Sequence, residues 1–131
     1  MLIRFLAEQK SIIKESMKII EDQTRKDGFD CIKFQNRTNN ETNYLNIISD
    51  RGCYSEIGKT KQNKSQILSL DVEPGCVVKH VVIHELVHAL MFHHEHKRPD
   101  RDEYIQIFKD NIDQSKLNAV FYKLRNSSII N

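Results

Sequence analysis

The spacing of apolar residues predicts a helix at the start of the chain. Apolar side chains recur at helical spacing at Ile13, Met17 and Ile20, Thr24 continues the stripe, and charged residues fill the opposite side. This period is typical of an amphipathic helix that buries one face, and it runs over about residues 6–26. The Asp27-Gly28 pair marks its end, because glycine and aspartate favour the backbone that stops a helix.

Three short stretches then carry strand patterns. Residues 30–35 and 67–72 alternate polar and apolar side chains, and residues 44–49 are rich in β-forming residues. Polar, asparagine-rich and lysine-rich loops separate these stretches. Alternation over four to eight residues predicts half-buried strands, so the chain combines strands with helices in an α+β fold.

A second helix is predicted after the Pro74-Gly75 turn. The stretch from Val77 to Phe92 is almost continuously apolar, and its only polar residues after His80 are His84, Glu85 and His88. Polar groups in a largely buried helix are costly unless they are paired, and metal binding supplies a reason for them. Beyond this helix we expect a charged segment at 97–103, a weak strand or turn over 104–112, and a short helix with a frayed tail from residue 114 onward.

The histidines carry the chemistry of this sequence. All six lie between His80 and His96, and His84 and His88 are four residues apart. Residues at this spacing share one face of a helix about one turn apart, so both imidazoles can bind one zinc ion. Glu85 sits beside them, where a carboxylate can take a proton from zinc-bound water.

A catalytic zinc usually takes three protein ligands, and the residues alone leave the third one open. His93, His94 and His96 are candidates, and Glu103 is an alternative on the pattern of other zinc peptidases. In a continuous helix His94 would lie about 15 Å beyond His84, too far for one ion. The helix must therefore end after His88 and the chain must turn back.

The residues that follow narrow the choice to one family. The run His84-Glu-Leu-Val-His-Ala-Leu-Met-Phe-His-His-Glu-His-Lys-Arg-Pro-Asp-Arg-Asp102 resembles the extended active-site motif of the astacin family of zinc peptidases. Upstream, Gly52-Cys-Tyr-Ser-Glu-Ile-Gly58, Leu68-Ser-Leu70 and Gly75-Cys76 are also similar to astacin sequences. One position departs from the pattern, because Met91 stands where the family has glycine.

The resemblance implies specific roles. His84, His88 and His94 would hold one Zn²⁺ per chain, and Glu85 would act as general base and then as proton donor in peptide-bond hydrolysis. The substrate would be a peptide or protein lying antiparallel to a sheet edge formed by Ile67, Leu68, Ser69 and Leu70. The alternative is a catalytically inactive zinc-binding remnant, which Met91 and the missing methionine turn favour.

Further residues receive structural roles from the same resemblance. Cys53 and Cys76 match a family disulfide, and Cys31 matches a cysteine whose partner lies beyond this chain. Glu95 matches a buried glutamate that pairs with the mature N-terminus. We expect Arg98, Asp100, Arg101 and Asp102 to form an ion-pair network that fixes the turn after the zinc ligands.

The implied fold is the upper subdomain of a zincin or metzincin. It has a twisted, mostly antiparallel-edged sheet of about four to five strands, packed on the N-terminal helix and the zinc-binding helix. Residues 1–131 would form a single partial catalytic domain, namely the N-terminal subdomain and the start of the C-terminal one, without the family's methionine turn.

Composition adds limits to this interpretation. A net charge of +2 gives no reason to expect nucleic-acid binding, no apolar run approaches the ~20 residues of a membrane span, and the oligomeric state is not predicted. Family resemblance favours secretion, as do the glycosylation sequons that begin at Asn36, Asn40, Asn63 and Asn126.

Overall fold

The computed structural model describes residues 5–60, 62, 64–73 and 75–123. The sequons at Asn63 and Asn126, Pro74 of the predicted turn and the tail from residue 124 lie outside these residues. The chain divides into two compact units, the first ending at Phe92 and the second beginning at His93. Each unit is described by itself.

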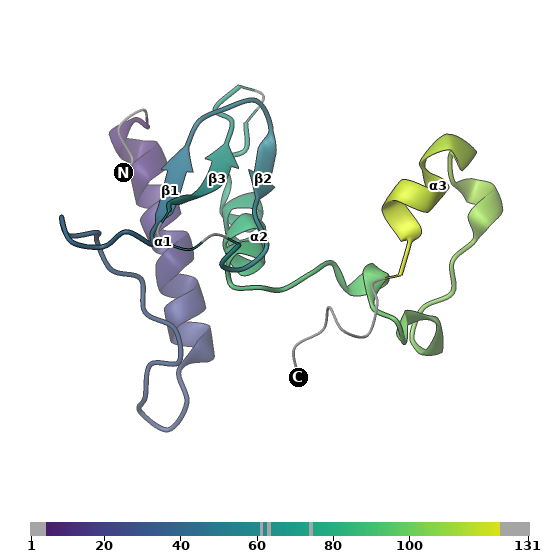
Figure 1. The fold of residues 1–131 in the computed structure, drawn as a ribbon, viewed down its shortest axis with the longest axis horizontal. Helices are drawn as coiled ribbons and strands as arrows, with labels where there is room; N and C mark the ends of the chain where they lie inside the picture. Colours follow the sequence, from purple (N-terminus) through teal and green to yellow (C-terminus); the bar gives the residue numbers. More distant parts are fainter. Residues whose placement is uncertain (1–4, 61, 63, 74, 124–131) are drawn as a thin grey trace. The chain divides into compact units, whose positions relative to one another are not determined.

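The first unit holds two helices and a small sheet, in the order α1 (Ala7–Thr24), β1 (Leu45–Ile48), β2 (Cys53–Ser55), β3 (Gln66–Leu70) and α2 (Lys79–Ala89) (Figure 1). The described part of the second unit contains three short 3-10 turns, at Glu95–Lys97, Arg101–Glu103 and Lys109–Asn111, and helix α3 (Gln114–Phe121). The α+β class expected from the sequence is therefore confirmed.

Helix α1 follows the predicted apolar stripe. Ile13 and Ile20 are buried, and Ser16 between them is buried with its hydroxyl donating to the Ile12 carbonyl at 2.8 Å. The helix ends at Thr24, two residues before the predicted end. Asp27 and Gly28 both adopt positive φ, 51° and 82°, which is the left-handed backbone expected of a stop signal.

The sheet has three strands in the described part of the chain, fewer than the four to five predicted. Their order is β1-β3-β2, with β1 parallel to β3 and β2 antiparallel to it. The predicted strand at 30–35 is wrong. There the backbone N–H of Phe34 donates to the Glu21 carboxylate at 2.8 Å, so this segment is held by a helix side chain instead of by a neighbouring strand.

Strand β3 is the central strand, which corrects the prediction that residues 67–70 form a sheet edge. Both sides of β3 are paired, and Leu68, Ser69 and Leu70 are fully buried. The Ser69 hydroxyl lies 3.1 Å from the Asp50 carbonyl and 3.0 Å from the Gly52 carbonyl. It therefore ties β3 to the loop before β2.

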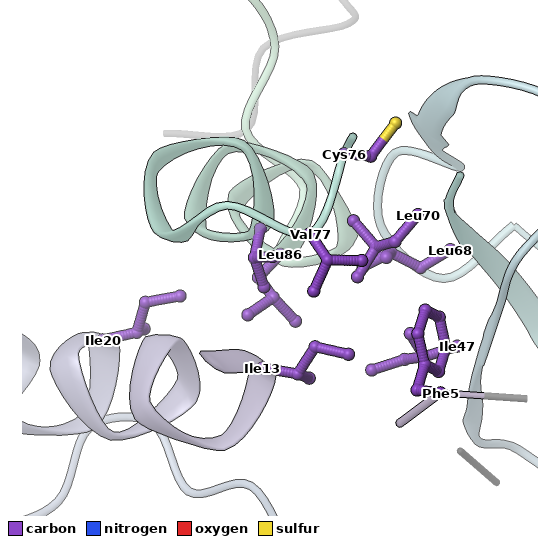
Figure 2. Packing of buried hydrophobic residues seen from close by; sticks show 10 residues of the cluster. Phe5, Ile13, Ile20, Ile47, Leu68, Leu70, Cys76, Val77 and Leu86 are labelled. Carbon is purple, nitrogen blue, oxygen red and sulfur yellow. The ribbon is translucent and has the colours of Figure 1, made fainter. Parts of the chain in front are cut away.

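The core of this unit forms where α1, α2 and the sheet meet. Figure 2 shows Ile13 and Ile20 of α1 facing Leu86 of α2, with Ile47, Leu68 and Leu70 approaching from the strands. Burying each such side chain stabilises the fold by roughly 1.5–3 kcal/mol. Helix α2 contacts α1 and also β2 and β3, so it is covered on several sides.

In the second unit, residues 104–112 form no strand. They contain one 3-10 turn at Lys109–Asn111, and the large side chains Tyr104, Ile105 and Phe108 are exposed. The predicted short helix is confirmed as α3. Among the described residues, no helix is long and apolar enough to cross a membrane.

A disulfide joins β2 to the segment that leads into α2. Cys53 and Cys76 are bonded across a separation of 23 residues, as the resemblance implies, and Cys76 is buried. Cys31 is free and exposed. Because a disulfide restricts the unfolded chain, this bond stabilises the sheet and the start of α2 together.

We expect the double variant Cys53→Ala/Cys76→Ala to lower the free energy of unfolding by about 3 kcal/mol, the value for a loop of this size. Urea unfolding measures the change, with Cys31→Ala as the matched control that leaves the midpoint in place. Equal midpoints for the double variant and the parent chain would contradict a stabilising role for this bond.

Candidate metal centre

Helix α2 places two imidazoles on one face. The ring centroids of His84 and His88 lie 4.5 Å apart with an interplanar angle of 78°. His84 is exposed and His88 is buried, so the pair extends from the surface into the unit. This is the geometry that the i, i+4 spacing predicts for two ligands of one ion.

The end of α2 turns the chain back, as the ligand spacing requires. Helical hydrogen bonding stops at Leu90, the Met91 N–H donates to the His88 carbonyl at 2.9 Å, and the Phe92 N–H donates to the Val87 carbonyl at 3.2 Å. These two bonds form a Schellman motif, whose left-handed position is usually glycine. Here that position is Met91, with φ 82°, at a cost of roughly 1–2 kcal/mol for an L-residue.

The same turn orients the ring of His88. The Phe92 carbonyl lies 2.7 Å from His88 Nδ1. A carbonyl can only accept a hydrogen bond, so it favours the tautomer that carries its proton on Nδ1 and leaves Nε2 for a metal. Partners of this kind commonly orient metal-binding histidines.

Glu85 is buried beside the two histidines. Its Oε2 has no hydrogen-bond partner within the described part of the chain. Burial raises the pKa of this carboxyl, and the nearby His84 and His88 act in the opposite direction. A buried carboxyl oxygen without a partner is costly to the fold.

A third histidine completes the group. Each of His84, His88 and His94 offers a ring nitrogen, and these nitrogens all lie within 4.8 Å of one another. Over the residues described, no other set of three His, Cys, Asp or Glu side chains comes together in this way. Catalytic zinc sites usually have three protein ligands, and a histidine nitrogen is one of the common donors.

The other candidate ligands lie outside this group. His80 is exposed, His93 is half-buried and Glu103 is exposed. His96 stacks on His94 with ring centroids 5.3 Å apart. Of the alternatives left open by the residues alone, the geometry therefore favours His94.

The charged residues after His94 form local ion pairs in the second unit. Arg98 contacts Asp100 through two nitrogens, at 2.9 and 2.8 Å, and Glu95 at 3.3 Å. Arg101 donates to the His96 carbonyl at 2.7 Å and contacts Asp102 at 3.2 Å. Arg101 thus contacts the backbone two residues after His94, and that these pairs fix the turn stays a prediction.

Glu95 differs from what the resemblance implies. Its side chain is 76% exposed, whereas the family glutamate is buried against a processed N-terminus. Arg98, three residues later along the same turn, is the cation that it contacts. The first four residues lie outside the description, so Glu95 is placed here only as a partner of Arg98.

Strand β2 and Gly58 lie near the candidate site, but the sequence predicted them only weakly. Strand β2 is short and its residues do not alternate in hydrophobicity, although it forms one edge of the sheet. The Gly58 N–H donates to the His88 carbonyl at 2.9 Å, which links the loop after β2 to the metal-binding helix. In the sequence, Gly58 stood out only as the last residue of the Gly52–Gly58 stretch that resembles astacin sequences, and nothing there predicted this hydrogen bond.

An α+β fold whose helix carries His-Glu-x-x-His, with a third histidine after a tight turn, is characteristic of zinc metallopeptidases. Comparison with known proteins agrees with this class. The model of the astacin peptidase family matches residues 3–131. The chain therefore belongs to the astacin family.

Individual relatives give the same result. The chain is 45% identical over 108 residues to astacin-like metalloprotease toxin 1 of Loxosceles intermedia, covering 82% of this chain and 37% of the toxin. It is 45% identical over 82 residues to zinc metalloproteinase nas-6 of Caenorhabditis elegans, covering 63% of this chain and 22% of that protein.

A solved structure also matches. High choriolytic enzyme 1, a hatching-enzyme zinc protease from Oryzias latipes, superimposes with a TM-score of 0.78 and 32% identity, covering 95% of this chain and 57% of that one. The chain thus spans well under two thirds of the length of each of these relatives.

The ion pair of Arg98 and Asp100 predicts a measurable pKa change. Hydrogen bonds from Arg98 lower the pKa of Asp100 below its ordinary value of 3.8. The ion pair therefore stabilises the fold above pH 3.8, and this contribution is lost as the pH falls through the lowered pKa of Asp100. We expect Arg98→Ala to raise the Asp100 pKa towards 3.8, measured by NMR titration of carboxyl shifts. Asp113, whose lowered pKa depends on Ser115, is the internal control; an unchanged Asp100 would contradict the pairing.

Proposed function

We propose that this chain is the N-terminal part of a zinc-dependent metalloendopeptidase domain that hydrolyses peptide bonds in proteins. The observation that carries the proposal is the buried, unpartnered Oε2 of Glu85 beside the His84–His88 pair. Burial makes this carboxylate costly to the fold, and a proton-transfer role explains why it is kept.

The residues fit a zinc ion. His84, His88 and His94 would hold it, because catalytic zinc sites take three protein ligands, three histidines in some enzymes, and keep one position open. When bound, zinc supplies Lewis-acid chemistry, polarising a substrate carbonyl and making water a stronger acid. The Phe92 carbonyl supports this assignment, since it fixes the orientation of His88.

Glu85 moves the proton in this proposal. As general base its carboxylate takes a proton from the attacking water, and the same group then returns the proton to the leaving amine of the peptide. A pKa raised by burial suits both steps, because a stronger base accepts the proton more readily near neutral pH. Among the described residues, none donates to Oε2 a hydrogen bond that would compete for that proton.

Strand β2 is the better candidate for the peptide-binding edge. It is an outer strand of the sheet and it contacts α2, whereas β3 is enclosed by strands on both sides. An extended peptide added to the free side of β2 would gain backbone hydrogen bonds close to the metal-binding helix. This assignment replaces Ile67, Leu68, Ser69 and Leu70 as the direct substrate contacts.

Secretion is part of the same proposal. The relatives include proteins named as toxins and a hatching enzyme, and the Cys53–Cys76 bond is typical of oxidising compartments. Asn36 and Asn40 lie in an exposed loop, where sequons are accessible to glycosylation.

The test compares the parent chain with Glu85→Gln, which keeps the size and polarity of the side chain but cannot accept a proton. Both proteins are loaded with zinc, the metal content is measured, and hydrolysis of an unfolded protein is assayed. We expect equal zinc content and a fall in kcat of about 10²–10⁴-fold, the usual contribution of a general base. Glu103→Gln, which changes an exposed glutamate of the second unit, is the control.

The outcomes separate the candidate functions. Bound zinc with hydrolysis no faster than that of Glu85→Gln would contradict the peptidase assignment and favour an inactive zinc-binding domain. A parent chain that takes up no zinc would exclude both, because each depends on the three histidines. Chelation is expected to abolish hydrolysis, and zinc readdition to restore it.

A further inference from the structure

Met91 and Gly58 form an unusual pair beside the metal-binding helix. Met91 holds the left-handed position of the turn after α2, at φ 82°, where a glycine would be unstrained. Gly58 lies in the loop between β2 and β3, also with positive φ, at 61°. Both residues are in the first unit.

The two residues contact each other closely. A Cβ atom placed on Gly58 would lie 2.8, 3.0 and 3.1 Å from Cε, Cγ and Cβ of Met91. The methionine tip could move away, but Met91 Cβ is fixed by its own backbone. The side chain of Met91 therefore covers the bare Cα of Gly58, and the two positions are sterically linked.

The backbones of Gly58 and Met91 both donate a hydrogen bond to the same carbonyl oxygen. The carbonyl of His88 accepts hydrogen bonds from the N–H of Gly58 and from the N–H of Met91, each at 2.9 Å. The carbonyl of Gly58 in turn accepts from the side chain of Gln66 in β3. The turn after α2 is thus anchored through Gly58 to the central strand of the sheet.

The same turn also contacts the ring of His88. The left-handed backbone at Met91 directs the next residue, and the carbonyl of Phe92 reaches His88 Nδ1 at 2.7 Å. A different φ at residue 91 would carry the Phe92 carbonyl away from that nitrogen. His88 would then lose the partner that orients its ring and its tautomer.

We propose that Met91 is a positioning residue for the metal site, acting through its contact with Gly58. The contact holds the strained turn in a single conformation, and the turn holds His88. A glycine at residue 91 would adopt the same φ without strain, but it would also be free to leave it, because nothing would cover Gly58. The inference rests on the proposed zinc-binding function, since it concerns the geometry of one of the ligands.

The test uses Met91→Gly, Met91→Leu, Gly58→Ala and the double variant Gly58→Ala/Met91→Gly. Zinc affinity is measured by competition with a chromophoric chelator, and the visible absorption of the Co²⁺-loaded protein reports ligand geometry. We expect Met91→Gly and Gly58→Ala each to weaken zinc binding by about 10–100-fold, the usual effect of losing a group that supports a ligand, and to alter the Co²⁺ spectrum.

Two variants show that the contact itself is responsible. Met91→Leu keeps a side chain of similar volume and is expected to stay within about threefold of the parent affinity. In the double variant the added methyl group meets no methionine, and only the strain of alanine at φ 61° remains, so the loss should be smaller than the two single losses added together. Gly28→Ala is the matched control: Gly28 also has φ 82° but nothing within 4 Å, so stability falls and zinc affinity does not.

Urea unfolding of the metal-free variants verifies that each one folds. The zinc measurements then distinguish a failure of the positioning role from a failure of the proposed function. If the parent binds zinc and Met91→Gly matches it in affinity and Co²⁺ spectrum, the positioning role is overturned and the proposed function stands. Additive losses in the double variant also overturn it, because independent effects exclude the contact as the cause. If the parent chain binds no zinc, the proposed function fails and the inference fails with it.

Discussion

The burial of helix α2 is the interaction on which the rest of the described fold depends. Val82 and Leu86 are fully buried, and the helix contacts α1 on one side and two strands on another. The same burial encloses Glu85 and His88, which would be solvated on a surface helix. Hydrophobic packing therefore supplies the stability that offsets two buried polar groups, and it also creates the low-dielectric surroundings that raise the pKa of Glu85.

The spacing of the proposed zinc ligands imposes a second constraint, at the end of the helix. A continuous helix would move later histidines away from His84, so the chain has to reverse within one turn after His88. The Schellman motif makes the reversal and satisfies the last helical carbonyls at once. Its left-handed residue is the only part that conflicts with ordinary side-chain sterics, and in this chain that residue carries a side chain that packs on a glycine.

The sequence predicted features with local causes and missed those set by distant partners. Helix α1 follows from apolar spacing, helix α2 follows from an almost continuous apolar stretch, and the facing pair of His84 and His88 follows from helical geometry alone. The alternation at residues 30–35 predicted a strand, yet Glu21 on α1 accepts the hydrogen bond of Phe34 and no strand pairs there. The central place of β3 depends on the order of strand pairing, which no short pattern records, so the prediction that residues 67–70 form a sheet edge was wrong.

The family pattern places a glycine three residues after His88, and this chain has Met91 there without losing the turn. That pattern concerns φ, and the structure keeps the φ while replacing the residue. Steric strain at one position can be retained when neighbouring groups determine the conformation, and here Gly58 supplies both a hydrogen bond to the His88 carbonyl and an uncovered Cα for the methionine. Residues 58 and 91 consequently act as one unit. The departure at Met91 is thus evidence about how the ligand turn is held in this chain, and it does not by itself argue against a working metal site.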